Sequence, residues 1–210
     1  MKNLIIVGAG GFGREMLQWI KDINKCEPMW NVLGFLDDTV DPLAGKRCTH
    51  SVIGSILDWE IQQDQYYAVA IANPQAKEKV VKLLKQRGAV FANIIHPRAI
   101  IADSAQYGDG IVIYPNTILG PDTSIGNYVT LLSSGIGHDA SIGDFSTVSS
   151  FCDITGGVQL GKRVFVASHS TIIPKISVGD DAYIGAGSVV IRNVKAETKV
   201  FGNPAKKYDL

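Results

Sequence analysis

The chain has 210 residues, of which 46% are hydrophobic, and its 20 basic and 20 acidic residues cancel. A chain of this length suits one large domain or two small ones. The lack of net positive charge argues against a nucleic-acid-binding protein. The three cysteines are widely spaced and form no CxxC pair, so neither a disulfide framework nor a metal site is expected.

The first apolar run breaks into glycines after Val7. It is too short for a membrane span or for the core of a signal peptide. We therefore expect a cytoplasmic protein with no membrane partner.

The first 93 residues alternate strand-like and helical stretches, which is typical of a small α/β sheet. The expected strands are Leu4–Val7, Val32–Leu36 and Ala68–Ala72, and the expected helices are Phe12–Ile23 and Pro74–Arg87. In the second helix we expect the lysines, Lys77 among them, to lie in solvent opposite an apolar side.

From about Ile94 the helical pattern disappears and an aliphatic residue recurs at every sixth position. Nine positions follow without a miss: Ile142, Val148, Ile154, Leu160, Val166, Ile172, Val178, Ile184 and Val190. This period predicts a triangular solenoid in which each hexapeptide forms one side and points its aliphatic side chain inward. Upstream we expect the series to run through Val112, Ile118, Ile125 and Leu131. It then gains a residue after Ile118 and loses one between Leu131 and Ile142.

A glycine-rich loop, residues 8–13, follows the first strand and opens the first helix. It leaves amide N–H groups and a positive helix end facing any bound anion, such as a phosphate. Asp37 and Asp38 end the second strand, where a dinucleotide fold places its ribose-binding acid. An oxidoreductase site and a simple packing turn both fit this local motif. However, fewer than about 100 residues precede the solenoid, enough for only half of a dinucleotide fold.

The six-residue repeat and the ending Gly202-Asn203-Pro204-Ala205-Lys206 resemble the hexapeptide-repeat acyltransferases. Four further segments make the likeness closer: GAGGFGRE at 8–15, LDD at 36–38, IHP at 95–97 and GHDASIGDF at 137–145. Together they resemble the sialic acid O-acetyltransferase NeuD family, which includes bacterial enzymes that N-acetylate nucleotide-linked 4-amino sugars toward bacillosamine or perosamine. The resemblance implies a mixed α/β plus all-β chain, with a Rossmann-like half-fold over 1–93 and a left-handed parallel β-helix over 94–210. It also implies a homotrimer and acetyl-CoA as co-substrate.

His138 is the candidate general base, because acyl transfer needs an uncharged nucleophile and imidazole accepts a proton near neutral pH. By resemblance, the acidic residue that follows it, Asp139, raises the basicity of the ring. Neighbouring residues on an extended chain point in opposite directions, so Asp139 can reach the ring only if the backbone turns. The residue lost near His138 permits such a turn. His169 is the competing histidine, in the middle of a hexapeptide, and four scattered histidines do not predict a metal site.

The resemblance also implies the binding residues. Acetyl-CoA contacts are implied for Gly156, Ser168, Ala186 and Lys206, and the nucleotide-sugar contacts for Gly10, Gly11, Phe12, Asp37 and Asp38. A backbone N–H of the Gly156-Gly157 pair, one 18-residue coil beyond His138, is placed to stabilise an oxyanion. Thr147 stands where some relatives have a second histidine, so a cofactor contact there is doubtful. Five cations are candidates for the phosphates of coenzyme A, although a wetted face explains them equally well: Lys162, Arg163, Lys175, Lys206 and Lys207.

The favoured function is N-acetylation of a nucleotide-linked amino sugar by direct transfer from acetyl-CoA. No cysteine or serine is placed as an acyl-accepting nucleophile. O-acetylation of sialic acid or another sugar hydroxyl is the alternative, because one base serves both nucleophiles. A non-catalytic β-helix scaffold or nucleotide-binding sensor is the third reading, and the His138-Asp139 pair and the GNPAK tail argue against it. The sequence leaves the sugar and the nucleotide open.

Overall fold

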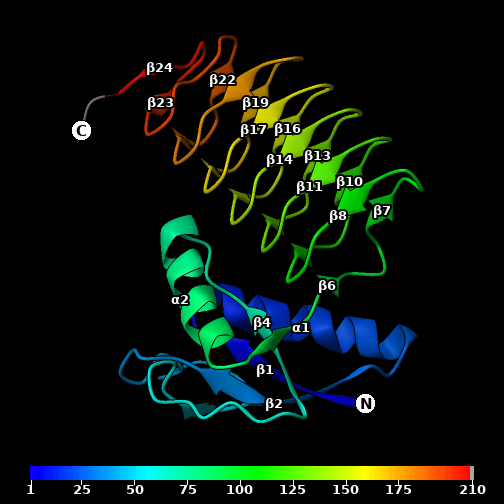
Figure 1. Cartoon of the computed structure of the whole chain (residues 1–210), viewed down its shortest axis with the longest axis vertical. Helices are drawn as coiled ribbons and strands as arrows, with labels where there is room; N and C mark the ends of the chain where they lie inside the picture. Colours follow the sequence, from blue (N-terminus) through cyan, green and yellow to red (C-terminus); the bar gives the residue numbers. More distant parts are fainter. Residues whose placement is uncertain (209–210) are drawn as a thin grey trace. The chain divides into compact units, whose positions relative to one another are not determined.

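The computed structural model describes residues 1–208, which form two compact units that divide after Pro97 (Figure 1). Each unit is described by itself. In the part of the chain that is described, no helix is long and apolar enough to cross a bilayer.

The first unit is built on a parallel sheet with the strand order β3-β2-β1-β4-β5. Its elements are β1 (Lys2–Val7), α1 (Gly11–Cys26), β2 (Trp30–Leu36), β3 (Val52–Gly54), β4 (Gln65–Val69), α2 (Pro74–Gln86), β5 (Val90–Phe91) and β6 (Ile94–Ile95). All five predicted elements are present, with β4 starting and ending three residues earlier than expected. The strand order reverses between β1 and β4, and the carboxyl ends of the strands at such a switch point are where open α/β sheets bind ligands.

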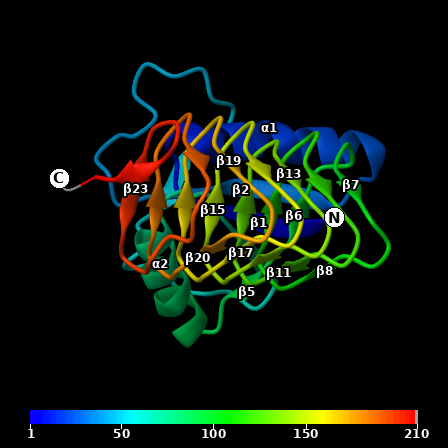
Figure 2. The same ribbon diagram turned by 90° about the horizontal axis from the view of Figure 1, so that it is seen from above.

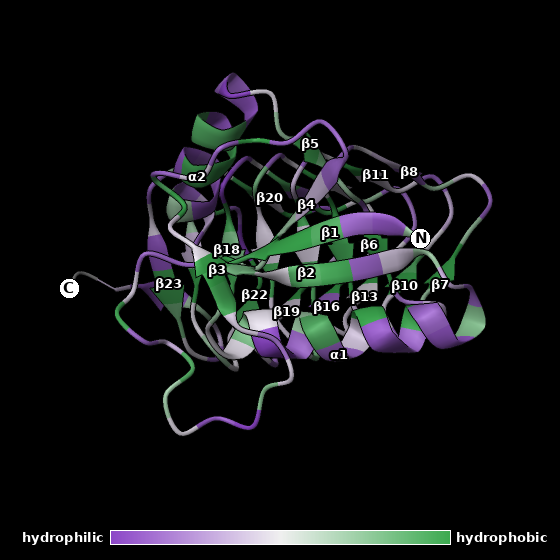
Figure 3. Cartoon of the chain, turned by 90° about the horizontal axis from the view of Figure 1, so that it is seen from below, coloured by the Kyte–Doolittle hydropathy of each residue, from purple (hydrophilic) through white to green (hydrophobic). Residues whose placement is uncertain are grey.

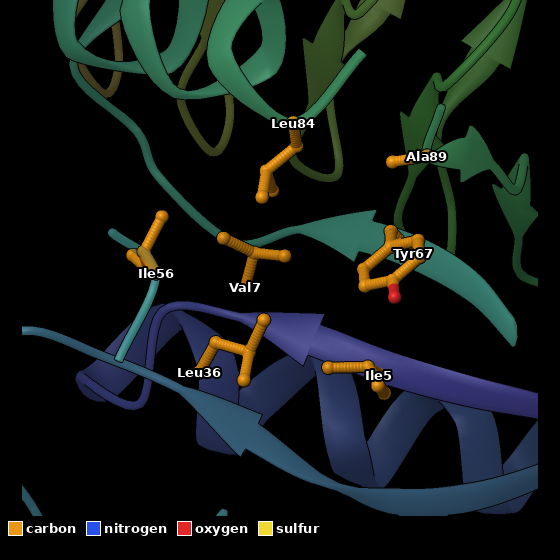
Figure 4. Close-up of a cluster of buried hydrophobic side chains, with 7 residues drawn as sticks. All are labelled: Ile5, Val7, Leu36, Ile56, Tyr67, Leu84 and Ala89. Atoms are coloured by element: carbon orange, nitrogen blue, oxygen red, sulfur yellow. The ribbon is translucent and has the colours of Figure 1, made fainter. Parts of the chain in front are cut away.

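Apolar side chains from the strands and from α2 form one core of this unit (Figure 4). Ile5 and Val7 of β1, Leu36 of β2, Tyr67 of β4 and Leu84 of α2 are all fully buried. Figure 3 shows the matching pattern of hydropathy, with β1 and β2 largely hydrophobic and α1 alternating along its length. The helix is amphipathic because its buried residues recur three or four positions apart.

Lys77 contradicts the predicted solvent face of α2. Its side chain is only 1% exposed, because it shares the inner face of the helix with Pro74, Val81 and Leu84. Burial penalises the charged form and lowers the pKa of Lys77 to about 7. Lysine was placed outside on residue type alone, whereas its position in the helical repeat puts it inside.

The first prediction concerns this lysine. Between about pH 7 and pH 10 the unfolded chain binds a proton at Lys77 that the folded chain does not. The free energy of unfolding of the wild type should therefore rise with pH across this window. Lys77→Met should flatten the rise and stabilise the protein near pH 7, measured by urea unfolding at several pH values. An unchanged pH slope in the variant would contradict the burial argument.

The second unit is a parallel β-helix whose coils stack along one axis (Figure 2). Its first face consists of β7 (Ile100–Ile101), β10 (Ile118–Leu119), β13 (Gly135–Ile136), β16 (Asp153–Ile154), β19 (Thr171–Ile172) and β22 (Val189–Val190). Its second face consists of β8 (Gln106–Tyr107), β11 (Ser124–Ile125), β14 (Ser141–Ile142), β17 (Gln159–Leu160) and β20 (Ser177–Val178). Its third face consists of β9 (Val112–Ile113), β12 (Thr130–Leu131), β15 (Thr147–Val148), β18 (Phe165–Val166), β21 (Tyr183–Ile184), β23 (Lys199–Phe201) and the antiparallel β24 (Lys206–Lys207).

The inward column of the β-helix agrees with the prediction from Ile142 to Val190, where all nine aliphatic residues are at most 4% exposed. Upstream, the predictions for Val112 and Ile118 were wrong. Val112 pairs with Thr130, whereas its neighbour Ile113 pairs with the inward Leu131. Ile118 is 48% exposed, whereas Leu119 is 1% exposed and pairs with the inward Ile136. The inward series therefore continues in steps of six through Leu119, with no inserted residue.

The inward series departs from its six-residue step at one place, between Leu131 and Ile136, which are five residues apart. Strand pairing shows the shift directly, because Ile118 pairs with Ile100 on one side, 18 residues away, and with Gly135 on the other, 17 residues away. The register break therefore lies ahead of His138 and not at it.

Most corners of the prism are short turns in which one residue has a positive φ. Twelve non-glycine residues of this unit adopt that conformation: Asn116, Asp122, Tyr128, Ser133, Asp139, Phe145, Phe151, Arg163, His169, Lys175, Asp181 and Glu197. Such values are uncommon for residues with a Cβ, so the stacking of the coils must hold them in place.

The second prediction tests the inward column. Leu160→Ala should lower the free energy of unfolding by about 2 to 5 kcal/mol, because it opens a cavity among residues that cannot collapse onto it. Gln159→Ala changes the neighbouring, outward and exposed side chain of the same strand, and its effect should stay within about 0.5 kcal/mol. Equal losses in urea unfolding would show that the column does not carry the stability.

Candidate active site

His138 and Asp139 form the corner between the first and second faces of the β-helix. Nδ1 of the His138 ring lies 2.6 Å from Oδ2 of Asp139, and both side chains are exposed. A carboxylate only accepts hydrogen bonds, so Nδ1 donates the proton and, in the neutral ring, Nε2 keeps a free lone pair. The arrangement is that of a base oriented by a carboxylate.

The turn that brings Asp139 back to its neighbour is the ordinary corner turn. Asp139 has φ of +59°, and Asp122 has the same φ at the preceding corner of this column. The register break was expected to provide this turn, and that expectation was wrong. Any corner of the prism allows the second residue to fold back toward the first.

The imidazole of His138 lies directly over Gly156 of the next coil. A Cβ at Gly156 would come within 2.6 Å of Nε2 and 2.7 Å of Cε1 of the ring. Real Cβ atoms do not approach other atoms so closely, so only glycine allows the ring to take this position. Gly156 therefore seats the ring and leaves Nε2 accessible.

The backbone of the glycine pair offers one donor to the site. The N–H of Gly157 is used, since it donates to the carbonyl oxygen of His138 at 2.8 Å. The carbonyl of Gly156 accepts from the N–H of Lys175 at 3.0 Å. Within residues 1–208 the N–H of Gly156 makes no hydrogen bond, so it can serve a ligand.

The residues expected to contact acetyl-CoA are divided between different corners. Gly156 shares a corner with His138, whereas Ser168 and Ala186 lie one coil apart on the corner between the third and first faces. The N–H of Gly187 donates to the carbonyl of Ser168 at 3.0 Å, which ties these two coils together. Thr147 is fully buried on the third face.

Lys206 belongs to β24, where the chain turns back along β23 after Gly202. The N–H of Ala205 donates to the carbonyl of Val189 at 2.8 Å, which fixes the turn to the last coil. The GNPAK segment is therefore an ordered closure of the β-helix, with Lys206 exposed on it.

Two of the five candidate cations already have carboxylate partners. Lys162 lies 3.2 Å from Asp144, and the guanidinium of Arg163 binds both carboxylate oxygens of Asp181. Lys175, in contrast, makes no ion pair among the described residues.

The remaining histidines do not form a second centre. His169 was expected in the middle of a hexapeptide, but it lies at a corner with φ of +60° and stacks on Phe151 with the ring centroids 5.1 Å apart. In the first unit, His96 is buried and makes an edge contact with Trp19. Burial and the nearby Lys21 lower the pKa of His50. No group of three or more His, Cys, Asp or Glu residues in 1–208 could hold a metal ion.

In the first unit, two glycines of the loop are required by packing and two are not. A Cβ added at Gly8 would collide with the carbonyl oxygen of Ala70. A Cβ added at Gly13 would collide with the carbonyl oxygen of Gly8. At Gly10 a Cβ would meet nothing within 4 Å, and at Gly11 only the tip of Arg14 at 4.0 Å. The space before α1 is therefore open, and no acidic residue occupies the first turn of the helix.

Asp37 and Asp38 organise the loops around this space. Burial alone would raise the pKa of the Asp37 carboxyl, but hydrogen bonds from the N–H groups of Ala9 and Thr39 outweigh it and keep the pKa below its usual value. Asp38 accepts from the hydroxyl of Ser55 and the N–H of Ile56, both at 2.7 Å. Asp37 thus anchors the glycine loop, and Asp38 anchors the loop that follows β3.

Comparison with known proteins decides the family. The chain is 30% identical over 211 residues to GDP-perosamine N-acetyltransferase of Escherichia coli O157:H7, covering 96% of this chain and 94% of the relative. The chain belongs to the hexapeptide-repeat acyltransferase family of that enzyme. Residues 3–84 also match the PglD N-terminal domain, so the predicted NeuD-type acyltransferase is confirmed.

Two solved structures agree with the fold. PerB from Caulobacter crescentus, in complex with CoA and GDP-perosamine, has a TM-score of 0.89 at 24% identity, covering 100% of this chain and 98% of PerB. WeeI from Acinetobacter baumannii has a TM-score of 0.86 at 26% identity, covering 99% and 100%. The predicted order of an α/β region followed by a parallel β-helix is confirmed.

The third prediction concerns the seat of the imidazole. Gly156→Ala should displace the His138 ring and lower the acyl-transfer rate at least about tenfold, with an unchanged melting temperature. Gly135→Ala is the control, because its Cβ would meet only Asp153 at 3.7 Å, an ordinary contact. Full activity of Gly156→Ala would contradict the proximity of ring and glycine.

Proposed function

We propose that the protein transfers the acetyl group of acetyl-CoA to the amino group of a nucleotide-linked amino sugar. The observation that carries the proposal is the His138–Asp139 pair, whose ring is oriented by a 2.6 Å hydrogen bond and is open at Nε2. The relatives support the substrate class, since a 30% identical protein is named GDP-perosamine N-acetyltransferase and PerB was crystallised with CoA and GDP-perosamine.

The proposed step is a direct transfer. The amine nitrogen attacks the thioester carbonyl carbon, and its proton passes to Nε2 of His138. The carbonyl electrons move to oxygen, where the N–H of Gly156 stabilises the negative charge. When the C–S bond breaks, sulfur leaves as thiolate and takes the proton from the imidazolium, so the products are the amide and free CoA. Asp139 stabilises the imidazolium in between.

Acetyl-CoA is proposed to contact Gly156, Ser168, Ala186 and Lys206, all in the second unit. The corner of Ser168 and Ala186 is not the corner of His138, so one protomer does not present both along a single edge. We propose that the protein is a homotrimer in which the Ser168 corner of one subunit lies beside the His138 corner of its neighbour.

The nucleotide-sugar is proposed to bind at the glycine loop of the first unit. The open space at Gly10 and Gly11 lies at the positive end of α1, which suits a phosphate, and Phe12 follows in the first turn of that helix. Asp37 and Asp38 anchor the loops beside it and lie where the ribose or base would be held.

The fourth prediction tests this chemistry. With acetyl-CoA and a panel of nucleotide-linked 4-amino sugars, the wild type should release thiol and add one acetyl group, read by mass. His138→Ala should lose at least about 100-fold in turnover, the usual contribution of a general base. His169→Ala is the control and should stay near wild type. The proposal would be refuted if no amino sugar gave thiol release above background, or if His138→Ala remained active. Acetylation of a hydroxyl instead of an amine would indicate an O-acetyltransferase.

A further inference from the structure

Gly156 and Gly157, which follow His138 by one coil, are glycines for different structural reasons. The His138 ring requires Gly156, as shown above. A Cβ at Gly157 would meet nothing closer than Cγ of Lys175 at 3.4 Å, which is an ordinary contact. Its φ of +69° does not require glycine either, since twelve other residues of this unit carry a side chain at that conformation. Gly157 therefore leaves room at this corner, bounded on one side by the Lys175 side chain.

This space, the Gly157 gap, lies between an anion and a cation. Within the column of second corner residues, Asp139 precedes Gly157 by one coil and Lys175 follows it by one coil. Neighbouring coils are about 4.8 Å apart, so the gap is one strand spacing deep on each side. The Lys175 side chain leans over the gap, because its Cγ is nearer to the Cβ position of Gly157 than its Cα, 3.4 Å against 4.0 Å.

The two charges differ in how they are engaged. The carboxylate of Asp139 is held by the ring of His138 at 2.6 Å. Lys175 makes no ion pair in the part of the chain that the structure describes, so its charge acts on whatever enters the gap. The other charged groups around this corner are Asp153 on the strand that leads to the glycine pair and Arg192 one coil above Lys175.

We propose that the Gly157 gap receives the reacting amine of the acceptor and that Lys175 holds this amine in its unprotonated form. The inference rests on the proposed function. Lys175 repels an ammonium group that enters the gap and so lowers the pKa of the bound amine, whereas the Asp139 carboxylate acts in the opposite direction. The proposal gives Lys175 the larger effect because its side chain leans into the gap, while the carboxylate of Asp139 is turned toward the His138 ring. Nε2 of His138, over the adjacent Gly156, then faces a nucleophile with its lone pair available.

The fifth prediction fills the gap. Asparagine tolerates the left-handed conformation, so Gly157→Asn should fold with an unchanged melting temperature. Its side chain should lower kcat/KM for the amino sugar at least tenfold while the KM for acetyl-CoA stays the same. Gly45→Asn is the control, since Gly45 has φ of +66° and open space around its Cβ in a loop of the first unit. A variant with wild-type kinetics, or one in which only the KM for acetyl-CoA rises, would overturn the assignment of the gap.

The charge of Lys175 is tested by the pH profile of kcat, which reports groups in the bound complex. Removing a nearby positive charge raises the pKa of the bound amine, so Lys175→Met should move the acid limb to higher pH by about one unit. The rate on that limb should fall about tenfold and recover at alkaline pH. Lys175→Arg should keep the wild-type limb, as should the control Lys195→Met. A packing role would instead lower the rate equally at all pH values, and an unmoved limb overturns the proposal.

These outcomes are separable from failure of the proposed function. If the wild type acetylates an amino sugar and both variants match it, only the role of the gap and of Lys175 falls. If the wild type acetylates no amino sugar, the proposed function falls first and the inference with it.

Discussion

Parallel pairing between successive coils is the constraint on which the site depends. In the β-helix, paired strands of successive coils lie 16 to 18 residues apart, so residues separated by one coil are stacked on the same corner. This pairing brings the ring of His138 onto Gly156, although no local pattern links the two positions. It also places Lys175 above Gly157. A displacement of one residue in the pairing would put each of these side chains on a different part of the prism.

The inward column of aliphatic residues supplies stability, whereas the corners of the prism carry the candidate catalytic side chains. The aliphatic residues bury their side chains inside the prism, and the corners make few demands beyond a turn with one residue at positive φ. Residues as different as Tyr128, Arg163 and Asp181 satisfy that turn. Because the coils hold the turn whatever its side chain, a corner can carry an exposed imidazole and carboxylate without a loss of core packing.

Much of the fold could be predicted from sequence, and the errors have identifiable causes. From Ile142 onward, only one position of the hexapeptide is aliphatic in all nine repeats, which left a single choice of inward side chain. Upstream, Ile118 and Leu119 are both aliphatic, so the repeat alone could not tell which one points inward; the stacking on Ile136 decides it. Lys77 was misplaced for the opposite reason, since residue type outweighed its position on the buried side of α2.

The candidate site was predictable as residues but not as geometry. The pairing of His138 with Asp139 required a turn that could not be read from sequence, because so many residue types occupy the corners. The sequence alone also did not show which structural role each glycine has. Gly13 prevents a collision with a neighbouring backbone, Gly156 makes room for the His138 ring, Gly10 has open space around its Cβ position, and Gly157 leaves room beside Lys175. Gly45 also has open space around its Cβ position, in a loop with no candidate site, so room at a glycine suggests a ligand only beside groups that could act on one, such as His138 and Lys175 at Gly157.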